Sequence, residues 1–249
     1  MPFIILVGNR LLYFEVNIYH SIQNYSMDQN IKKKEAAKKA LELIMPHLNE
    51  DTILGIGTGS TTNFFIEELA KSNLIFKGVI CSSEASKENF LNTGINILEL
   101  NDVYSIDFYI DGADEYNSRF ELIKGGGGAL TREKILAHSS EKFLCIVDDS
   151  KFTEHLGKFP LPIEVLEISR SAISRKILKM GGKPKYRSGF VTDNGNQIID
   201  INNFKIDVPY DMENLLNSIP GVVENGIFSK RKADIVIEAT NKGTQVKKL

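Results

Sequence analysis

The sequence predicts an α/β protein: a mostly parallel, Rossmann-like sheet with helices on both faces, plus an inserted small α+β lobe. Strand-like apolar runs alternate with helical patterns through about residue 150, as parallel βαβ units require. After residue 151 the order becomes strand, helix, strand, strand, helix, strand, which is typical of a small antiparallel α+β module. Four polar motifs, GTGST, SSEAS, DGADE and KGGGG, follow apolar runs in the first part. Because parallel strands end at one edge of their sheet, these motifs predict a shared site.

The composition is that of a globular protein with a sizeable core, and it excludes several classes of partner. Of the 249 residues 42% are hydrophobic and 25% charged, and the net charge of -2 provides no basic field for nucleic acid. No stretch approaches the ~18 apolar residues of a membrane helix. Cys81 and Cys145 stand singly in apolar runs, which indicates reduced, buried cysteines of a cytoplasmic protein. No histidine–cysteine cluster indicates a metal site.

Residues 1–26 differ in character from the rest of the chain. Their first apolar run, 3–7, is too short for a signal peptide and has no basic residue before it. We expect a poorly ordered extension here, or a start placed upstream of a genuine one at Met27.

The first elements after this extension are a helix and a strand–turn–helix unit. Residues 31–48 predict an amphipathic helix whose apolar face carries Ile31, Ala37, Ala40, Leu41, Ile44 and Leu48. We expect its five lysines to lie on a solvated surface, although one of them could reach a phosphate. Residues 52–56 predict a buried strand, and residues 60–70 predict a helix.

The motif GIGTGST, residues 55–61, joins that strand to that helix. Glycines let the backbone approach a ligand, and the free N–H groups and hydroxyls of a helix start suit a phosphate. An ordinary tight turn with a serine cap is the alternative. A dinucleotide site with Glu84 as the ribose-binding acid is disfavoured, because the third glycine of that fingerprint is absent.

The remaining elements follow from apolar runs bounded by turn residues. Before residue 151 we predict a strand at 76–81, a helix at 86–93, strands at 95–98 and 106–110, a helix opening at Ala129, and a strand at 142–147. After it we predict a strand within 159–168, a helix at 171–180, two strands joined by an Asn194–Gly195 turn, a helix at 211–218, and a strand at 221–228. Residues 233–240 predict a buried strand that returns to the first sheet.

The stretch 106–133 carries residues suited to proton transfer on an anionic substrate. Asp111 and Asp114 follow a strand, and two nearby acids raise each other's pKa, so that one can donate a proton to a sugar oxygen. Lys124 and the N–H groups of the glycines after it can stabilise an oxyanion. Glu133 lies near a helix start, where N–H groups are expected to hold it ionised, ready to take a proton from carbon.

Each of these residues also has an ordinary explanation. The acids of DGADE could cap a turn or bind Mg²⁺, Lys124 could be a surface lysine, and Glu133 could simply favour the helix dipole. Their occurrence together in one short stretch favours a catalytic site. The four histidines are scattered without metal spacing, so the predicted chemistry uses carboxylates and lysine without a metal.

A set of eight motifs resembles the ribose-5-phosphate isomerase type A family. They are GIGTGSTT (55–62), SSEAS (82–86), DGADE (111–115), KGGGGALTREK (124–134), DDSK (148–151), LGKFPLPIEV (156–165), VTDNGN (191–196) and IPGVVENGIF (219–228). The resemblance runs from about Met27 to the C-terminus. It implies interconversion of ribose 5-phosphate and ribulose 5-phosphate through an enediolate, in the pentose phosphate pathway and without a cofactor.

The resemblance also implies roles for individual residues. Glu133 would move the proton between C1 and C2, Asp111 would assist ring opening, and Asp114 and Lys124 would orient the substrate and stabilise the oxyanion. Lys33 is a further candidate for a basic contact. The implied substrate-binding residues are Thr58, Gly59, Ser60, Thr61, Asp111, Gly112, Asp114, Lys124, Gly125, Gly126, Glu133 and Lys151, with no metal.

Members of this family have an α/β domain with an inserted ferredoxin-like lobe, and they are dimers or tetramers. We therefore expect a catalytic domain at 27–156 and 229–249, a ferredoxin-like lobe at 157–228, and a homodimer or homotetramer. Two departures stand out. Gly128 occupies a position where alanine is common, and Glu84 occupies one where aspartate is usual.

Three other functions compete with this interpretation. A non-catalytic sugar-phosphate sensor would be expected to lack Asp111, Lys124 or Glu133, all of which are present. A sugar-phosphate deaminase would need a histidine near the base, which the stretch 106–133 lacks, and a CoA transferase is a further enzyme on the same kind of sheet. A Mg²⁺-dependent phosphotransferase would use DGADE as its metal site.

Overall fold

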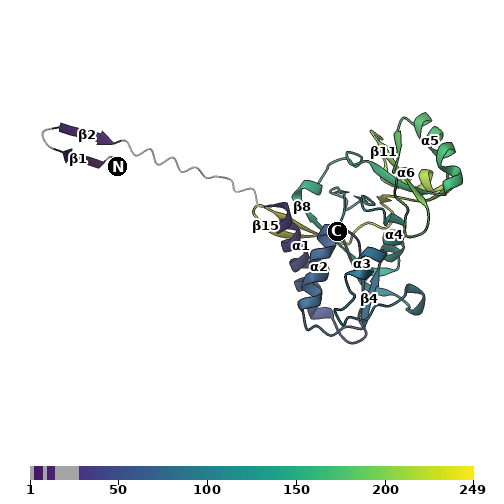
Figure 1. The fold of residues 1–249 in the computed structure, drawn as a ribbon, viewed down its shortest axis with the longest axis horizontal. Helices are drawn as coiled ribbons and strands as arrows, with labels where there is room; N and C mark the ends of the chain where they lie inside the picture. The colour runs from purple at the N-terminus through teal and green to yellow at the C-terminus, as the bar shows by residue number, and fades with distance from the viewer. Residues whose placement is uncertain (1–2, 8–9, 15–27) are drawn as a thin grey trace.

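The computed structural model describes residues 3–7, 10–14 and 28–249 (Figure 1). Phe3–Val7 (β1) and Arg10–Phe14 (β2) pair as antiparallel strands, which the sequence analysis did not expect. The other predictions for residues 1–27 lie outside the described residues.

A six-stranded sheet, in the order β15-β14-β8-β5-β3-β4, forms the centre of the larger part of the molecule (Figure 1). Its strands are β3 (Ile53–Ile56), β4 (Gly78–Cys81), β5 (Ile106–Asp111), β8 (Ser140–Asp148), β14 (Ile235–Thr240) and β15 (Gly243–Lys248). All neighbours run parallel except β14 and β15. The predicted mostly parallel α/β sheet is confirmed.

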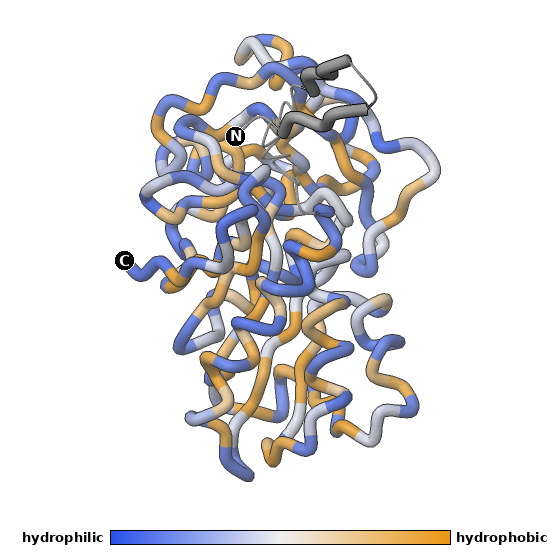
Figure 2. Tube along the Cα trace, turned by 90° about the vertical axis from the view of Figure 1, so that its left-hand side faces the viewer, coloured by the Kyte–Doolittle hydropathy of each residue, from blue (hydrophilic) through white to orange (hydrophobic). Residues whose placement is uncertain are grey.

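Apolar cores form on both faces of this sheet. On one face, α1 (Gln29–Ile44) and α2 (Ser60–Lys71) pack against β3, β5, β8 and β14. On the other, α4 (Leu130–His138) packs with a small sheet of β13 (Ile227–Phe228), β7 (Leu122–Ile123) and β6 (Glu115–Tyr116). Coloured by hydropathy, the chain alternates hydrophobic with hydrophilic runs (Figure 2), as a chain that passes repeatedly through a core must.

A second, four-stranded sheet carries the predicted βαββαβ order. Its elements are β9 (Leu161–Val165), α5 (Arg170–Lys179), β10 (Lys183–Tyr186), β11 (Gln197–Asn202), α6 (Pro209–Asn217) and β12 (Val222–Asn225). The strand order is β10-β11-β9-β12, and every pair is antiparallel. This is the arrangement of a ferredoxin-like module. The lobe limits of 157 and 228 stay a prediction.

Several predicted elements differ in the structure. Residues 95–98 form no strand, because only Ile97 makes an isolated bridge, to Val79 of β4. The helix predicted at 86–93 is a short α3 (Glu84–Glu88) whose first turn is capped by the Ser83 hydroxyl. Short 3-10 helices fill other connections, at Met45–His47 (η1), Leu100–Asp102 (η2), Asp149–Lys151 (η3) and Glu167–Ser169 (η4).

The last predictions for the lobe were also partly wrong. Asn194 and Gly195 lie in a turn, but a connection of residues 187–196 joins β10 to β11, since Tyr186 pairs with Ile199 rather than across that turn. The strand predicted at 221–228 is split between two sheets, with Gly226 at the break.

The lysines of α1 are not all solvated. Lys32 is only 7% exposed, and its Nζ forms an ion pair with Asp149 Oδ1 at 2.8 Å. Ile31, by contrast, is 50% exposed and was wrongly placed on the apolar face, whereas Ala37, Ala40 and Ile44 are buried as predicted. The prediction failed because the hydrophobic pattern does not show which polar residue has a buried partner elsewhere in the chain.

Candidate active site

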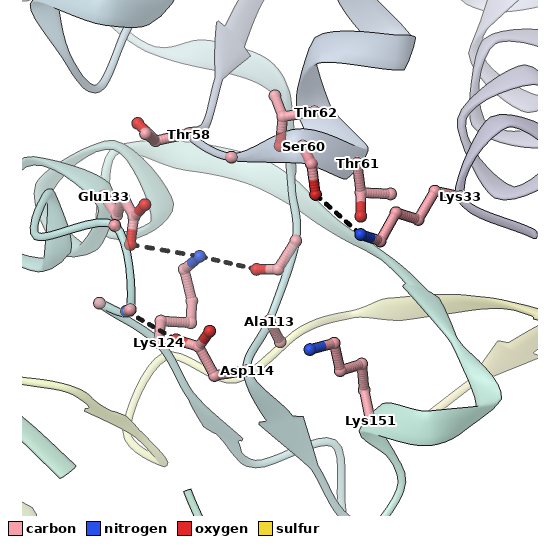
Figure 3. A pocket seen from close by; sticks show the side chains of 15 residues that line it. Lys33, Thr58, Ser60, Thr61, Thr62, Ala113, Asp114, Lys124, Glu133 and Lys151 are labelled. Carbon is pink, nitrogen blue, oxygen red and sulfur yellow. Dashed lines mark hydrogen bonds and ion pairs between the residues drawn. The ribbon is translucent and has the colours of Figure 1, made fainter. Parts of the chain in front are cut away.

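A pocket opens where β3, β5 and β8 end, at the predicted edge of the sheet (Figure 3). The residues that line it are Lys33, Thr58, Gly59, Ser60, Thr61, Thr62, Gly112, Ala113, Asp114, Lys124, Gly125, Gly126, Gly127, Glu133 and Lys151. The structure therefore brings together every member of the predicted substrate-binding set except Asp111. The Asp111 side chain is fully buried behind Lys124 and does not line the pocket.

One end of the pocket is built for an anion. Gly59 has a φ of +116°, which favours glycine, and it turns the chain into α2. The first residues of this helix, Ser60 and Thr61, line the pocket, and N–H groups at a helix start have no partner within the helix. Lys33 Nζ lies 3.0 Å from Ser60 Oγ, and Lys151 reaches the pocket from η3 (Figure 3). A helix N-terminus with two lysines beside it is a strong site for a phosphate group.

The serine motif supports the glycine turn rather than lining the pocket. Thr58 Oγ1 contacts Ser82 Oγ and donates to Ser83 Oγ, both at 2.8 Å. Ser86 Oγ donates to Gly57 O at 2.6 Å. These hydroxyls fix the turn before α2, and Thr58 is the one that also reaches the pocket.

Asp111 is a fully buried carboxylate with several polar partners. Its Oδ1 accepts from the backbone N–H groups of Thr58, at 3.1 Å, and Gly112, at 2.7 Å. Its Oδ2 accepts from the Tyr109 hydroxyl and forms an ion pair with Lys124 Nζ at 2.6 Å. The carboxylate thus ties the glycine turn and the strand end to the lysine.

Lys124 stands between two carboxylates. Its Nζ lies 2.6 Å from Asp111 Oδ2 and 3.3 Å from Glu133 Oε2, and it donates to Gly112 O at 2.7 Å (Figure 3). Burial alone would lower the pKa of Lys124, but the two neighbouring carboxylates raise it. The lysine is therefore a fixed positive charge that lines the pocket.

Glu133 is a buried carboxylate of α4 that points into the pocket (Figure 3). Burial raises its pKa from 4.5 to about 8, against the opposing effect of the Lys124 charge. The prediction that helix N–H groups hold Glu133 ionised was therefore wrong in its direction. Apart from its ion pair with Lys124 Nζ at 3.3 Å, Oε2 has no hydrogen-bond partner in the described part of the chain, so it has room to accept a proton.

The acids of DGADE face different partners, which separates them from a metal site. Asp114 lines the pocket and accepts from the Gly126 N–H at 2.8 Å, and burial raises its pKa. Glu115 turns away from the pocket to accept from the N–H groups of Gly157 and Phe159. Across the described residues, no group of three or more histidine, cysteine or acidic side chains is placed to hold a metal ion.

Three residues that line the pocket lie outside the predicted substrate-binding set: Thr62, Ala113 and Gly127. All three lie inside motifs that were identified, so their signal was position within the motif rather than residue type. Lys33, a candidate from a run of lysines, does line the pocket.

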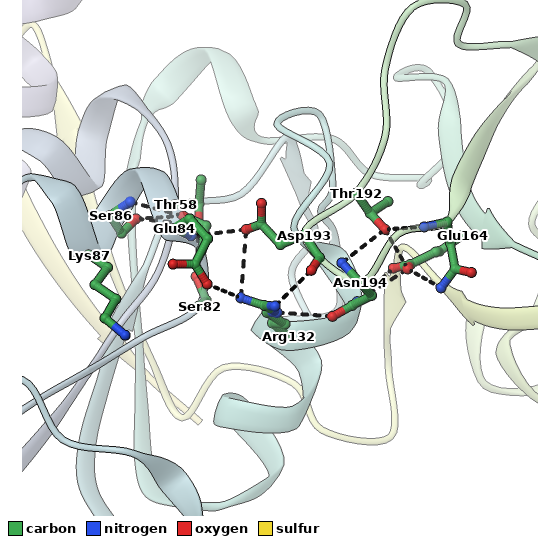
Figure 4. Close-up of polar contacts among 12 residues, drawn as sticks. Thr58, Ser82, Glu84, Ser86, Lys87, Arg132, Glu164, Thr192, Asp193 and Asn194 are labelled. Atoms are coloured by element: carbon green, nitrogen blue, oxygen red, sulfur yellow. Dashed lines mark hydrogen bonds and ion pairs between the residues drawn. The ribbon is translucent and has the colours of Figure 1, made fainter.

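Arg132, the residue before Glu133, links α4 to the lobe (Figure 4). Arg132 forms an ion pair with Glu84 at 2.9 Å, and it donates to Asn194 Oδ1 at 2.9 Å and to Asp193 O at 2.8 Å. Asp193 in turn accepts from the Glu84 N–H at 3.0 Å. Glu84 thus pairs with an arginine and is not among the residues that line the pocket.

Comparisons with known proteins show the family of this chain. The chain matches a model of the ribose 5-phosphate isomerase A (phosphoriboisomerase A) family over residues 78–243. It is 48% identical to ribose 5-phosphate isomerase A from Neisseria gonorrhoeae, with a TM-score of 0.86 and coverage of 90% of this chain and 99% of the other. A D-ribose-5-phosphate isomerase in complex with phospho-erythronic acid is 40% identical, with a TM-score of 0.84 and coverage of 90% and 100%. The enzyme from Methanocaldococcus jannaschii is 37% identical, with a TM-score of 0.82 and coverage of 89% and 100%. The chain belongs to the ribose 5-phosphate isomerase A family.

Proposed function

We propose that this protein interconverts D-ribose 5-phosphate and D-ribulose 5-phosphate through an enediolate, as an aldose–ketose isomerase of the pentose phosphate pathway. The observation that carries the proposal is the pairing of Glu133 with Lys124 inside a pocket that has an anion site at its other end. Family membership supports the same reaction. A relative in complex with phospho-erythronic acid indicates that a sugar-phosphate analogue fits this fold.

The phosphate of the substrate would bind at the start of α2. Free N–H groups at the helix start, the hydroxyls of Ser60 and Thr61, and the charges of Lys33 and Lys151 provide donors for its oxygens. The open-chain sugar would then extend toward Asp114, Lys124 and Glu133. Holding the phosphate in this way fixes C1 and C2 near the base, which lowers the entropy loss of reaching the transition state.

Glu133 would carry the proton. Its carboxylate removes the hydrogen of C2 as a proton, the C2 electrons form a double bond to C1, and the carbonyl electrons move onto O1. Glu133 then returns the proton to C1, while the O2 hydroxyl proton passes to O1 and C2 becomes the carbonyl carbon. Lys124 and the N–H groups of the glycine loop would stabilise the oxyanion, for which one donor contributes about 2.7–4 kcal/mol in well-studied sites.

We also propose that Asp111 assists the opening of the sugar ring indirectly, by way of Lys124. Its carboxylate contacts Lys124 Nζ rather than the pocket, so a proton for the ring oxygen would pass by way of the lysine. Asp114, which does line the pocket, would orient the sugar hydroxyls.

We propose a cytoplasmic homodimer or homotetramer that needs no cofactor and binds no nucleic acid. The lack of a basic field supports the last point. In the described residues, no helix has the length and apolar character that crossing a membrane would require.

The test is isomerisation of ribose 5-phosphate by the purified protein in EDTA, with unphosphorylated ribose as the comparison substrate. We expect metal-independent conversion of the phosphorylated sugar only. Activity that requires added Mg²⁺ would contradict the carboxylate–lysine mechanism. A folded protein that binds the sugar phosphate without converting it would be a sensor.

A further inference from the structure

The glycine loop of the pocket has an anchor on the ferredoxin-like sheet. Arg187, the first residue after β10, donates to Asp200 of β11 through two nitrogens, with Nε at 2.9 Å from Oδ2. The same guanidinium donates to Gly126 O at 3.1 Å and to Gly125 O at 3.3 Å. Arg187 therefore spans from the second sheet to two consecutive carbonyl groups of the catalytic loop.

These contacts settle which way the loop peptides face. A trans peptide is planar, so its carbonyl and its N–H point in opposite directions. With Gly126 O held toward Arg187, the N–H of Gly127 faces away from the arginine, and Gly127 itself lines the pocket. The preceding peptide is fixed as well, since Gly125 O faces Arg187 while the Gly126 N–H donates to Asp114 Oδ2 at 2.8 Å. The Gly127 N–H has no hydrogen-bond partner within the described residues.

The run of four glycines holds only part of this orientation by itself: the Gly128 N–H donates to Gly125 O at 2.9 Å, but no donor within the run reaches Gly126 O. Gly125 and Gly128 have φ angles of +103° and +86°, and no side chain in the run restricts the backbone. The donor to Gly126 O comes from outside the run, and the planar fork of an arginine can hold this carbonyl oxygen, Gly125 O and a carboxylate at once. Both partners are well shielded, with side-chain exposures of 19% for Arg187 and 20% for Asp200.

We propose that Arg187, oriented by Asp200, is a positioning residue for the proposed isomerisation. It sets the Gly126–Gly127 peptide so that the Gly127 N–H meets the oxyanion of the enediolate. The inference rests on the proposed function and assigns the lobe a part in the reaction. Among the described residues, Arg187 makes no hydrogen bond or ion pair to the phosphate end of the pocket, so we expect its effect at the sugar end.

The test compares Arg187→Gln, Arg187→Lys and Asp200→Asn with Arg175→Gln, which changes an exposed arginine of α5. We expect kcat to fall about 10–100-fold in Arg187→Gln, somewhat less than for a direct oxyanion donor, with KM within about threefold. Arg187→Lys and Asp200→Asn are expected to fall between wild type and Arg187→Gln. Arg175→Gln should match wild type.

Calorimetric binding of phospho-erythronic acid and of inorganic phosphate separates positioning from general damage. We expect Arg187→Gln to weaken phospho-erythronic acid at least tenfold while inorganic phosphate binds as in wild type. Unchanged kcat, a rise in KM alone, or equal weakening of both ligands would overturn the inference. If the wild type itself does not isomerise ribose 5-phosphate, the proposed function fails. If the wild type is active and the Arg187 and Asp200 variants are equally active, only this inference is refuted.

Discussion

The pH dependence of the reaction follows from the burial of Glu133. Burial raises its pKa to about 8, far above that of an exposed glutamate, and we expect activity to rise as this carboxylate ionises. A base with a pKa of about 8 is about one-tenth ionised at pH 7 and about one-hundredth at pH 6. We therefore expect kcat/KM to rise about tenfold for each pH unit from 6 to 7.5 and to level off above pH 8.5. An exposed glutamate, with an ordinary pKa near 4.3, would give a flat profile over this range.

The assay is the initial rate of ribulose 5-phosphate formation at low substrate concentration, from pH 5.5 to 9.5. The substrate phosphate titrates near pH 6, about two pH units below the transition expected for Glu133, so the two transitions can be separated. Asp114→Asn provides a directional control. The negative charge of Asp114 raises the pKa of Glu133, so its removal should move the upper transition to lower pH even though the rate also falls. A profile that is flat from pH 6.5 to 9, or a shift in the opposite direction in Asp114→Asn, would refute this account of the base.

Three further predictions concern the phosphate end and the loops. Lys151→Ala should raise KM roughly tenfold or more with little change in kcat, since a charged donor to phosphate contributes about 1.5–3 kcal/mol. An unchanged KM would remove Lys151 from the substrate-binding set. Gly57→Ala should lower the free energy of unfolding by about 1–3 kcal/mol, because the added Cβ would lie 1.9 Å from Asp111 Cγ. A denaturant titration with the midpoint of the wild type would contradict that packing. Gly128→Ala should reduce thermal stability, since the added Cβ would lie 2.2 Å from Phe190 Cζ and the backbone φ is +86°. Adding Phe190→Val should restore part of the loss, and a double variant no more stable than Gly128→Ala would contradict the clash.

The sequence predicted the site well because its parts lie in short motifs. KGGGG follows β7 of the small antiparallel sheet, so Lys124 reaches the pocket through the pairing of β7 with β6. DGADE follows β5 of the parallel sheet, and the rule that such strands end at a common edge placed Asp114 at the pocket. The same rule placed Thr58 to Thr61 beside Asp114. Local chemistry and this rule were therefore sufficient for the residues that follow β3 and β5, whereas the position of the glycine loop depends on the small antiparallel sheet.

Features that depend on tertiary burial could not be predicted in this way. Helix-end chemistry suggested an ionised Glu133, but the surrounding core has the larger effect and raises its pKa. Lys32 looked like one more exposed lysine until packing placed Asp149 beside it. The contact of Arg187 with Gly125 and Gly126 joins residues about 60 positions apart, and no periodic pattern in either segment indicates it.

The most direct measurement is isomerisation by Glu133→Gln beside wild type and Glu141→Gln, which changes an exposed acid of β8. The account predicts that Glu133→Gln loses kcat by about 10²–10⁴-fold or more, while it binds phospho-erythronic acid within a few-fold of wild type, because the pocket remains but the base is gone. Exchange of the C2 hydrogen with solvent deuterium should be lost together with turnover, and Glu141→Gln should behave as wild type. Near-normal turnover by a folded Glu133→Gln protein would contradict the central claim that this buried carboxylate moves the proton.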